Sequence, residues 1–340
     1  MKSIGVLGAG TWGMALAKVL SNAGHRVTVW SAIEKEIDEF SLTRVHPNLP
    51  GMQIPERIVF TKEIETVCKD QDFLLFAVPS VFVRSTAAKA AAYIPDGQII
   101  IDVAKGIEND TLFTMTQIIA DAVKNPTVKL VALSGPTHAE EVALDMPTTI
   151  VSASEDMDAA EQVQDLFLQT CIRAYTNTDV LGVELSGAMK NIIALASGIA
   201  TGLGCGDNTK AAIITRGIAE ISRLGVAMGC NEQTFGGLAG IGDLIVTATS
   251  IHSRNNRCGM LLGKGVPAEE AIKQVGMVVE GINALKAAMQ LQDRYQVEMP
   301  IVSAVNAIVY EGAVPSETVQ KLMTRHRKSE IPTDHLFRSN

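Results

Sequence analysis

A glycine-rich turn near the start of the chain joins an apolar strand to an apolar helix. Residues Ser3–Leu7 have the composition of a buried strand, the turn reads Gly8-Ala9-Gly10-Thr11-Trp12-Gly13, and residues 14–20 continue as a helix. Gly8 permits the tight turn, Gly10 leaves room for a pyrophosphate beside the backbone, and Gly13 lets the helix pack close to the strand. Free N–H groups and the positive end of the helix dipole attract phosphate. This strand–turn–helix arrangement predicts a dinucleotide-binding site.

The first half of the chain alternates apolar strands with helical segments. Further strands are expected at 26–30, 58–61, 73–78, 98–102, 128–133, 148–153 and 172–176. Uninterrupted Val, Ile and Leu runs are typical of strands that helices cover on both faces, so we expect a Rossmann-like, doubly wound sheet. Ligands bind beyond the carboxyl ends of such strands. The segments in that position are Ala77–Ser80, Ala104–Gly106 and Ser134–Thr137.

The pattern changes near residue 179, where strand-like runs stop. Helices are expected at 180–199, 208–228, 244–250, 268–274, 280–295, 301–310 and 316–324. We therefore expect an α/β chain in which an N-terminal Rossmann-like doubly wound sheet precedes an all-helical C-terminal domain. The expected domains are a dinucleotide-binding domain at 1–178, a helical substrate and catalytic domain at 179–325, and a polar tail at 326–340.

Charge and composition exclude several classes of function. The chain has 340 residues and a net charge of −8, so nucleic acid is not expected as a partner. The most apolar stretch, Ile192–Ala200, is too short to span a bilayer, and no signal peptide is expected because the first strand begins at Ser3. Five scattered cysteines without a CxxC pair predict reduced thiols, no metal site and a cytoplasmic protein. The oligomeric state stays open, a homodimer through the helical half being one alternative.

Lys190 is the first candidate for chemistry in the helical half. On a helix it shares its face mostly with small residues, namely Val183, Ser186, Gly187, Ala194 and Ser197. Small neighbours leave room for a ligand, and partial burial lowers the pKa of a lysine towards neutrality, as a general acid or base requires. The alternative is a lysine that extends to the surface. Asn191 beside it in so apolar a helix favours the functional interpretation.

Two further polar clusters lie in the helical half. Residues 204–216 place two basic side chains on an apolar helix, which a helix cap does not explain. Asp243 follows a glycine-rich turn and is either a helix cap or a functional acid. Ten residues further, Ser253-Arg254-Asn255-Asn256-Arg257 combines a hydroxyl, amides and two guanidinium groups. Because arginine suits bidentate binding of phosphate, this run predicts an oxyanion site.

With these segments together, the chain resembles the bacterial NAD(P)-dependent glycerol-3-phosphate dehydrogenase family over nearly its whole length. The matching stretches are Gly8–Ala17, Ala77–Ser80, Ala104–Glu108, Leu133–Pro136, Ala139–Ala143, Gly182–Ile199, Gly206–Arg216, Ala239–Thr249, Ser253–Asn255 and Val278–Gly281. The resemblance implies reduction of dihydroxyacetone phosphate to sn-glycerol 3-phosphate, which supplies glycerophospholipid synthesis. It also implies NAD or NADP as cofactor and a small phosphorylated triose as substrate.

The resemblance assigns roles to individual positions. Lys190 matches the catalytic general acid/base and Asp243 the acid held beside it, and both also contact substrate. Other positions that match substrate contacts are Lys105, Gly135, Thr137, Ser253, Arg254 and Asn255, of which the last three form the phosphate-binding run. Positions that match the dinucleotide site are Gly8, Gly10, Thr11, Trp12, Gly13, Lys105, Ala139, Arg254, Val278 and Glu280.

The chain departs from the family pattern in three places. The family usually has Ser-Phe-Ala where this chain has Thr137-His138-Ala139, which keeps the hydroxyl and leaves the role of His138 open. Asn48 stands where an aromatic residue often precedes Leu-Pro-Gly, and the segment Arg44–Gly51 is short, which leaves the packing of the adenosine open. An arginine often follows the second strand, but Trp30-Ser31-Ala32 stands there.

The same position bears on the choice of cofactor. An NAD-selective site usually has Asp or Glu at the end of the second strand, whereas the first acid here is Glu34. Without that carboxylate a 2′-phosphate is not repelled, which slightly favours NADP. Arg44 is the only nearby basic candidate, so both cofactors stay open.

Two other functions fit the same architecture. A dehydrogenase for hydroxy acids or sugar acids also pairs a Rossmann domain with helices and a lysine, but it has no use for a phosphate site at Ser253–Asn255. A redox-sensing binding protein would keep the dinucleotide site and would not need Lys190 and Asp243.

Overall fold

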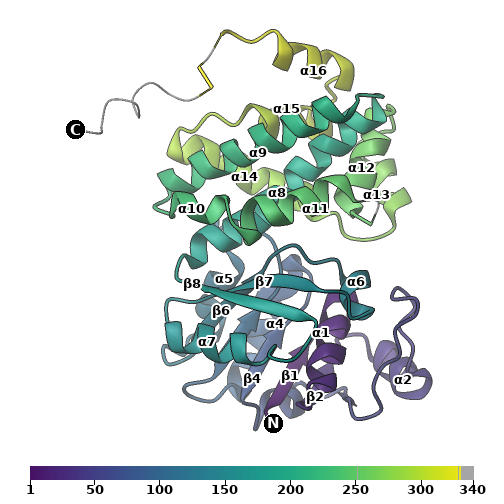
Figure 1. Cartoon of the computed structure of the whole chain (residues 1–340), viewed down its shortest axis with the longest axis vertical. Coiled ribbons are helices and arrows are strands. Elements are labelled where there is room, and N and C mark those ends of the chain that lie inside the picture. The colour runs from purple at the N-terminus through teal and green to yellow at the C-terminus, as the bar shows by residue number, and fades with distance from the viewer. Residues whose placement is uncertain (251, 328, 331–340) are drawn as a thin grey trace.

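The computed structural model describes residues 1–250, 252–327 and 329–330. A sheet with its helices forms one half of the molecule, and helices alone form the other (Figure 1). The eight strands stand in the order β3-β2-β1-β4-β5-β6-β7-β8. Their bounds are Ser3–Leu7 (β1), Arg26–Trp30 (β2), Val59–Thr61 (β3), Phe73–Phe76 (β4), Ile99–Asp102 (β5), Lys129–Ser134 (β6), Thr148–Ala153 (β7) and Ile172–Asn177 (β8). The expected doubly wound sheet is confirmed.

Helices cover both faces of the sheet, which explains the uninterrupted apolar strands. Successive residues of a strand point to opposite faces. Phe73 and Leu75 of β4 accordingly belong to one hydrophobic cluster, and Leu74 and Phe76 belong to another on the opposite face. The helices of this half are Thr11–Asn22 (α1), Glu34–Thr43 (α2), Ile64–Cys68 (α3), Val83–Ala90 (α4), Met115–Val123 (α5), Ala139–Ala143 (α6) and Met157–Asp165 (α7).

The sheet differs from a purely parallel arrangement at one pair of strands. β7 runs antiparallel to β6, while β7 and β8 are parallel. The connection between β6 and β7 contains only the short helix α6, which covers too little length for a crossover back to the start of the sheet. β4 also ends at Phe76, two residues earlier than the apolar run suggests.

The second half is built around α8 (Val180–Gly202), which is buried along almost its whole length. The other elements of this half are α9 (Asp207–Ala227), α10 (Glu232–Phe235), a π-helical turn η3 (Leu238–Gly242), α11 (Asp243–Thr249), α12 (Arg254–Gly263), α13 (Ala268–Val275), α14 (Glu280–Tyr295), α15 (Pro300–Tyr310) and α16 (Pro315–Met323). α12 was not expected from the sequence. The backbones of α12 and α8 lie in close contact. A Cβ atom added at Gly198 of α8 would lie 2.2 Å from the Asn256 carbonyl oxygen of α12, so only glycine fits at this position.

Helix α8 is long and apolar enough to cross a membrane by length and composition. The stretch Ile192–Ala200, which the sequence analysis took as the most apolar, is only part of this helix. However, 89% of its most apolar window is buried inside the protein. Such burial is typical of a helix at the core of a helical domain.

The two halves meet along α8. The sheet ends at Asn177, and Asp179 caps α8 by accepting a hydrogen bond from the Gly182 amide (3.0 Å). Near the start of the helix, the buried Glu184 carboxylate accepts hydrogen bonds from Thr114 Oγ1 (2.7 Å) and from the amide and hydroxyl of Thr116 (2.8 and 2.6 Å). This carboxylate binds the N-terminus of α5 in the sheet half. The chain thus passes between the halves at 178–179, although the predicted division into two folding units stays a prediction.

Candidate active site

A cleft of about 650 Å³ lies between the carboxyl edge of the sheet and the helical half. Its walls come from the ends of β1, β4, β5 and β6 and from α8, α11, α12 and α14. The predicted site residues that line it are Gly10, Thr11, Trp12, Lys105, Thr137, Ala139, Lys190, Ser253, Arg254, Asn255, Val278 and Glu280. Segments far apart in the sequence therefore meet where ligands bind in doubly wound sheets.

The glycine turn has the geometry of a phosphate site. Gly8 has φ +122°, and a Cβ atom there would lie 2.6 Å from the Ala77 carbonyl oxygen, while one at Gly13 would lie 2.4 Å from the Gly8 carbonyl oxygen. In contrast, nothing lies within 4 Å of a Cβ atom at Gly10. The first hydrogen bond of α1 runs from the Met14 amide to the Gly10 carbonyl, so the amides of the turn have no carbonyl within the helix to bind. The turn therefore fits the pyrophosphate of a dinucleotide.

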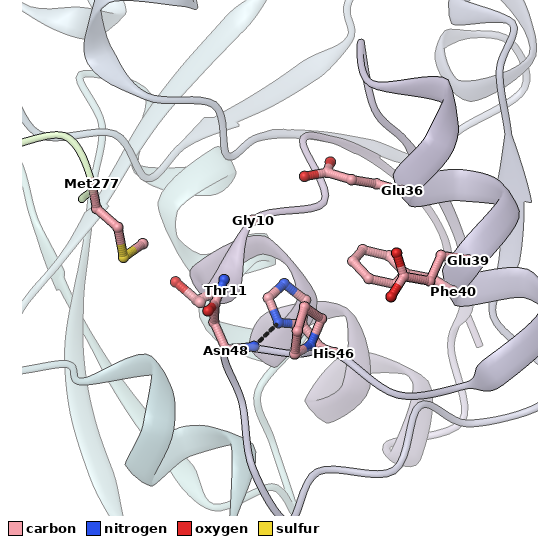
Figure 2. A pocket seen from close by; sticks show the side chains of 9 residues that line it. Gly10, Thr11, Glu36, Glu39, Phe40, His46, Asn48 and Met277 are labelled. Carbon is pink, nitrogen blue, oxygen red and sulfur yellow. Dashed lines mark hydrogen bonds between the residues drawn. The ribbon is translucent and has the colours of Figure 1, made fainter.

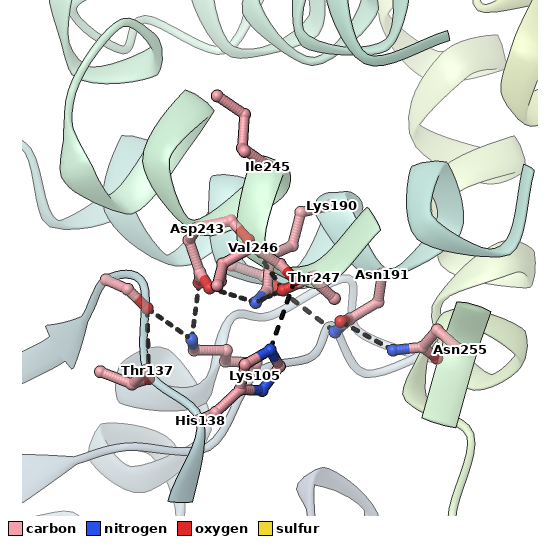
Figure 3. A network of polar contacts seen from close by, with 12 residues as sticks. Lys105, Thr137, His138, Lys190, Asn191, Asp243, Ile245, Val246, Thr247 and Asn255 are labelled. Carbon is pink, nitrogen blue, oxygen red and sulfur yellow. Dashed lines mark hydrogen bonds and ion pairs between the residues drawn. The ribbon is translucent and has the colours of Figure 1, made fainter. Parts of the chain in front are cut away.

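Lys190, Asp243 and Lys105 form a buried ionic cluster at one wall of the cleft (Figure 3). The Lys190 ammonium donates to Asp243 Oδ1, and the Lys105 ammonium donates to Asp243 Oδ2 (2.6 Å) and to the Gly135 carbonyl (3.3 Å). Asp243 is fully buried and Lys190 is 5% exposed. One carboxylate thus holds two ammonium groups, one from each half of the protein.

Burial lowers the pKa of the Lys190 ammonium to about 7. The Asp243 carboxylate opposes this shift, and the positive charge of Lys105 adds to it. The sequence left open which effect is larger, and in the structure desolvation is. A lysine with a pKa near neutrality can both donate and accept a proton at physiological pH.

Thr247 belongs to the cluster and Asn191 lines the cleft beside Lys190, and the sequence analysis did not assign either to the site. Thr247 Oγ1 accepts a hydrogen bond from Lys190 (2.6 Å) and donates to the Asp243 carbonyl (2.7 Å). It stands one helical turn after Asp243 on α11, and this spacing is the signal that could have identified it. Asn191 follows Lys190 and donates to the Gly187 carbonyl (3.2 Å).

The run Ser253–Asn255 is divided between structural and free side chains. Ser253 Oγ caps α12 by accepting from the Asn256 amide (3.2 Å). Asn255 donates to Asn191 Oδ1 (2.9 Å) and accepts from the Gly281 amide (2.9 Å), so its side chain joins α8, α12 and α14. Arg254 is half-buried at the cleft, and within the described part of the chain its guanidinium has no hydrogen bond or ion pair. Arg254 is therefore the member of the run available to an anion.

The second polar cluster of the sequence analysis lies away from the cleft. Lys210 pairs with Asp207 (3.2 Å) at the start of α9, and Arg216 is exposed on the same helix. Neither side chain lines the cleft, whereas the exposed Arg257 does. Residues 204–216 therefore do not contribute to the site.

Thr137 and His138 follow β6 and face the cleft. Thr137 Oγ1 donates to the Gly135 carbonyl (3.2 Å). His138 Nε2 donates to the Val246 carbonyl (3.3 Å), and its ring centroid lies 6.0 Å from that of His252. Burial lowers the pKa of His138, which favours the neutral ring at physiological pH. His138 therefore joins the sheet half to α11 as an uncharged hydrogen-bond donor.

Glu280 joins the two halves on another side of the cleft. Its carboxylate accepts hydrogen bonds from the Ser80 amide (3.3 Å) and the Ser80 hydroxyl (2.6 Å). Ser80 follows β4, and Glu280 begins α14. The expected position of Glu280 beside the dinucleotide is compatible with this contact, because both residues line the cleft.

A smaller cavity of about 310 Å³ adjoins the glycine turn (Figure 2). Its lining residues are Gly10, Thr11, Glu36, Glu39, Phe40, His46, Pro47, Asn48 and Met277. The rings of Phe40 and His46 have centroids 5.0 Å apart and give this cavity an aromatic wall. Although Asn48 replaces the aromatic residue of the family pattern, the short segment Arg44–Gly51 still supplies such a wall through His46.

Models of one protein family match both halves of the chain. Models of the NAD-dependent glycerol-3-phosphate dehydrogenase N-terminus and C-terminus match residues 3–160 and 179–320. Glycerol-3-phosphate dehydrogenase (NAD(P)+) 2 of Lactobacillus delbrueckii subsp. bulgaricus is 65% identical over 97% of this chain and 99% of that protein. Its counterpart from Agathobacter rectalis is 51% identical over 97% of this chain and 98% of that protein.

Solved structures give the same result. The crystal structure of glycerol-3-phosphate dehydrogenase from Coxiella burnetii has a TM-score of 0.91 and 34% identity, over 95% of this chain and 99% of that one. A D-mandelate dehydrogenase shares the fold at a TM-score of 0.63 with only 12% identity, over 95% of this chain and 100% of that one. The fold alone therefore does not distinguish a dehydrogenase for a phosphorylated alcohol from one for a hydroxy acid, whereas the similarity in sequence does. The chain belongs to the NAD-dependent glycerol-3-phosphate dehydrogenase family.

Proposed function

We propose that this chain interconverts dihydroxyacetone phosphate and sn-glycerol 3-phosphate with NAD or NADP, and that Lys190 exchanges the proton. The observation that carries the proposal is a buried lysine with a pKa of about 7, which lines the same cleft as an open glycine turn and a free arginine. Family membership supplies the reaction, and the geometry supplies the residues. The assignments of individual residues below belong to this proposal.

A dinucleotide held at the turn of Gly8, Gly10 and Gly13 would supply the hydride for the carbonyl carbon of the substrate, or would accept it in oxidation. Lys190 donates its proton to the carbonyl oxygen as negative charge develops there, and it recovers the proton from the hydroxyl group in the reverse direction. General acid–base catalysis by a placed group contributes about a hundredfold to ten-thousandfold in rate.

Asp243 and Thr247 orient the Lys190 ammonium. The Asp243 carboxylate and the Thr247 hydroxyl both accept from Lys190 Nζ, so two of its N–H groups are held and one remains for the substrate. Lys105 is held by the other oxygen of Asp243. Its ammonium places a second positive charge at the developing oxyanion, where a fixed charge in a partly dry site stabilises the transition state.

Arg254 binds the phosphate of the substrate. A charge-assisted, bidentate contact from its guanidinium fixes the end of the triose remote from the reacting carbon. Binding energy from that end holds the carbonyl in place for the chemical step. Asn255 and Ser253 support Arg254 indirectly, since their side chains fix the start of α12. The Gly135 carbonyl accepts hydrogen bonds from both Thr137 and Lys105, and these contacts fix the neighbouring wall of the cleft.

The cofactor-binding residues follow from the same cleft. Gly8, Gly10 and Gly13 shape the turn. Thr11 and Trp12 are the first residues of α1, and both line the cleft. Ala139, Val278 and Glu280 line the cleft further along and would hold the nicotinamide half. We assign these residues to the dinucleotide.

Steady-state rates with dihydroxyacetone phosphate test the reaction. The purified chain should reduce this compound with NADH or NADPH, and Lys190→Ala should lose at least about a hundredfold in rate while it still binds the dinucleotide. Reduction of a 2-keto acid without reduction of dihydroxyacetone phosphate would favour the hydroxy-acid alternative. Near-normal turnover by Lys190→Ala would remove Lys190 from the mechanism.

We also propose that the reaction takes place in the cytoplasm and supplies glycerophospholipid synthesis. All five cysteines carry free thiols, as a reducing compartment favours. Burial raises the pKa of Cys68 and Cys230 to about 12, so these thiols resist oxidation. A homodimer through the helical half remains part of this proposal, and sedimentation of the purified protein tests it.

A further inference from the structure

We infer that Glu36, held by Ser31, makes this chain selective for NAD over NADP. The inference rests on the proposed function only for the statement that the glycine turn binds a nicotinamide dinucleotide. It is opposite to the slight preference for NADP that the residues directly after β2 suggest. The difference arises because the relevant carboxylate comes from α2 and not from the end of the strand.

The smaller cavity is the place for the adenosine half of the dinucleotide. It shares Gly10 and Thr11 with the large cleft, so the two spaces meet at the glycine turn. In doubly wound sheets the pyrophosphate lies at this turn, and an acid near the end of the second strand binds the ribose hydroxyl groups. The smaller cavity lies on that side, since α2 directly follows β2 and borders it.

Ser31 connects the end of β2 to Glu36. Its hydroxyl donates to Glu36 Oε2 (2.7 Å) and accepts from the Ile33 amide (3.1 Å). Ser31 is buried, Glu36 is half-buried, and Figure 2 shows the carboxylate extending from α2 into the space beside Gly10. The fold therefore brings a carboxylate from the first turn of α2 to the end of β2, where selective sites for NAD carry their acid.

The charges around the cavity favour a hydroxyl group over a phosphate. Glu36 and Glu39 line it, and among the described residues no lysine or arginine does. A phosphate monoester carries about 1.5 to 2 negative charges at pH 7 and would face both carboxylates. A ribose hydroxyl group instead donates to a carboxylate and gains a charge-assisted hydrogen bond.

Arg44, the basic candidate from the sequence, is engaged elsewhere. Its guanidinium donates to the Ile58 carbonyl (2.9 Å), lies 3.6 Å from the Glu56 carboxylate and stands 5.3 Å above the centroid of the Phe60 ring. Arg44 does not line the cavity. The cation that a 2′-phosphate would need is therefore not supplied by this residue.

Dissociation constants of NADH and NADPH test the inference without turnover. Quenching of tryptophan fluorescence in the full-length chain is a suitable signal, because Trp12 lines the cleft. The wild type should bind NADH at least about tenfold more tightly than NADPH, since like charges placed together cost several kcal/mol. Glu36→Gln, which keeps an acceptor for Ser31 but loses the charge, should reduce this ratio at least about fivefold, mainly by tightening NADPH.

Glu34→Gln is the matched control. Glu34 lies in the first turn of the same helix, but it faces Lys62 (3.6 Å) and does not line the cavity. Its variant should leave the ratio unchanged. Ser31→Ala keeps the charge of Glu36 and removes the hydrogen bond that places it, so it should weaken NADH more than NADPH.

Three results would overturn the inference: tighter binding of NADPH by the wild type, an unchanged ratio in Glu36→Gln, or an equal change in Glu34→Gln. A chain that discriminates through Glu36 but does not reduce dihydroxyacetone phosphate would leave the inference standing and overturn the proposed function. Failure to bind either dinucleotide would overturn both.

Discussion

Asp243→Asn is expected to move the pH dependence of reduction to lower pH. Lys190 must be protonated to donate, so kcat/KM for dihydroxyacetone phosphate should be high below its pKa of about 7 and fall above it. The Asp243 carboxylate raises that pKa, while burial and Lys105 lower it. With asparagine in its place, the raising effect is lost and the two lowering effects remain. The midpoint of the profile should therefore fall.

The size of the shift follows from the contact. Two opposite charges about 3 Å apart attract by about 5–6 kcal/mol at an effective dielectric constant of about 20. Since one pKa unit corresponds to about 1.4 kcal/mol, the upper limit is about four units. Water that enters the cleft and relaxation of Lys105 reduce this, and we expect about two units, within the usual range for an ion pair. The protonated fraction of Lys190 at pH 7 would then fall from about half to about 1%.

The assay is kcat/KM for dihydroxyacetone phosphate with saturating NADH, from about pH 5 to 9 at constant ionic strength. At pH 7 the kcat/KM of Asp243→Asn should be at least about tenfold below that of the wild type. This loss is smaller than the fall in the protonated fraction of Lys190, because a lysine with a lower pKa is a stronger acid and donates its proton more readily. The kcat/KM of the variant should recover near pH 5. Thr247→Val is the matched control: it removes the other hydrogen bond of Lys190 without removing charge, so its midpoint should shift much less. The phosphate of the substrate also titrates, but it does so equally in the assays of the wild type, Asp243→Asn and Thr247→Val, so the comparison between them is unaffected.

Loss of a buried ionic partner also destabilises a protein by about 3–5 kcal/mol. Circular dichroism and dinucleotide binding must therefore show that the variant is folded. A folded Asp243→Asn protein that keeps a midpoint near pH 7 would show that Asp243 does not control the protonation of Lys190. The proposed cluster would then be structural.

Three further predictions follow from single residues. Gly10→Val should abolish dinucleotide binding and leave the fold intact, because only open space surrounds a Cβ atom there; unchanged affinity in a titration would contradict the placement of the pyrophosphate. Arg254→Ala should lower the ratio of kcat/KM for dihydroxyacetone phosphate over dihydroxyacetone at least about tenfold, the worth of a charge-assisted contact; an equal loss for both would limit Arg254 to the cofactor. Burial raises the pKa of Glu220 to about 7, so its contribution to stability should be largest below about pH 4.5 and be lost as the pH rises through 7. Glu220→Gln should flatten this dependence in thermal melts at several pH values.

The sheet could be predicted well because its signals are local. Each apolar run forms its strand within one or two residues, as β1, β2 and β7 do without any difference. The direction of β7 could not be predicted, because it depends on how the short connection through α6 returns the chain to β6. Helix α12 was missed for a related reason. Its sequence is polar at the start, and its stability comes from close packing of glycines against α8 rather than from a periodic apolar face.

The proposed catalytic pair could be singled out in the sequence because rare residue types stand in apolar helices. Lys190 and Asp243 are conspicuous in such surroundings, and the structure brings them into contact. Asn191 supported the interpretation of Lys190 but was not itself assigned to the site, and Thr247 was not singled out, since threonine is common on helices for many reasons. The run Ser253–Asn255 shows the opposite difficulty. Its composition suggested three ligands for an anion, and the contacts with Asn256 and Gly281 show that two of the side chains also hold α12 in place. That Ser253 and Asn255 bind an anion stays a prediction.

The same contacts that arrange the chemistry also hold the two halves together. Lys105 belongs to the sheet half and Asp243 to the helical half, so their ion pair crosses the cleft. Ser80 and Glu280 cross it as well. A buried ion pair contributes little net stability, because desolvation offsets most of the attraction. Its value here is geometric: Lys190 can be correctly placed against a ligand on the sheet only when the halves are in register. Loss of Asp243 should therefore loosen the cleft and the proton donor together.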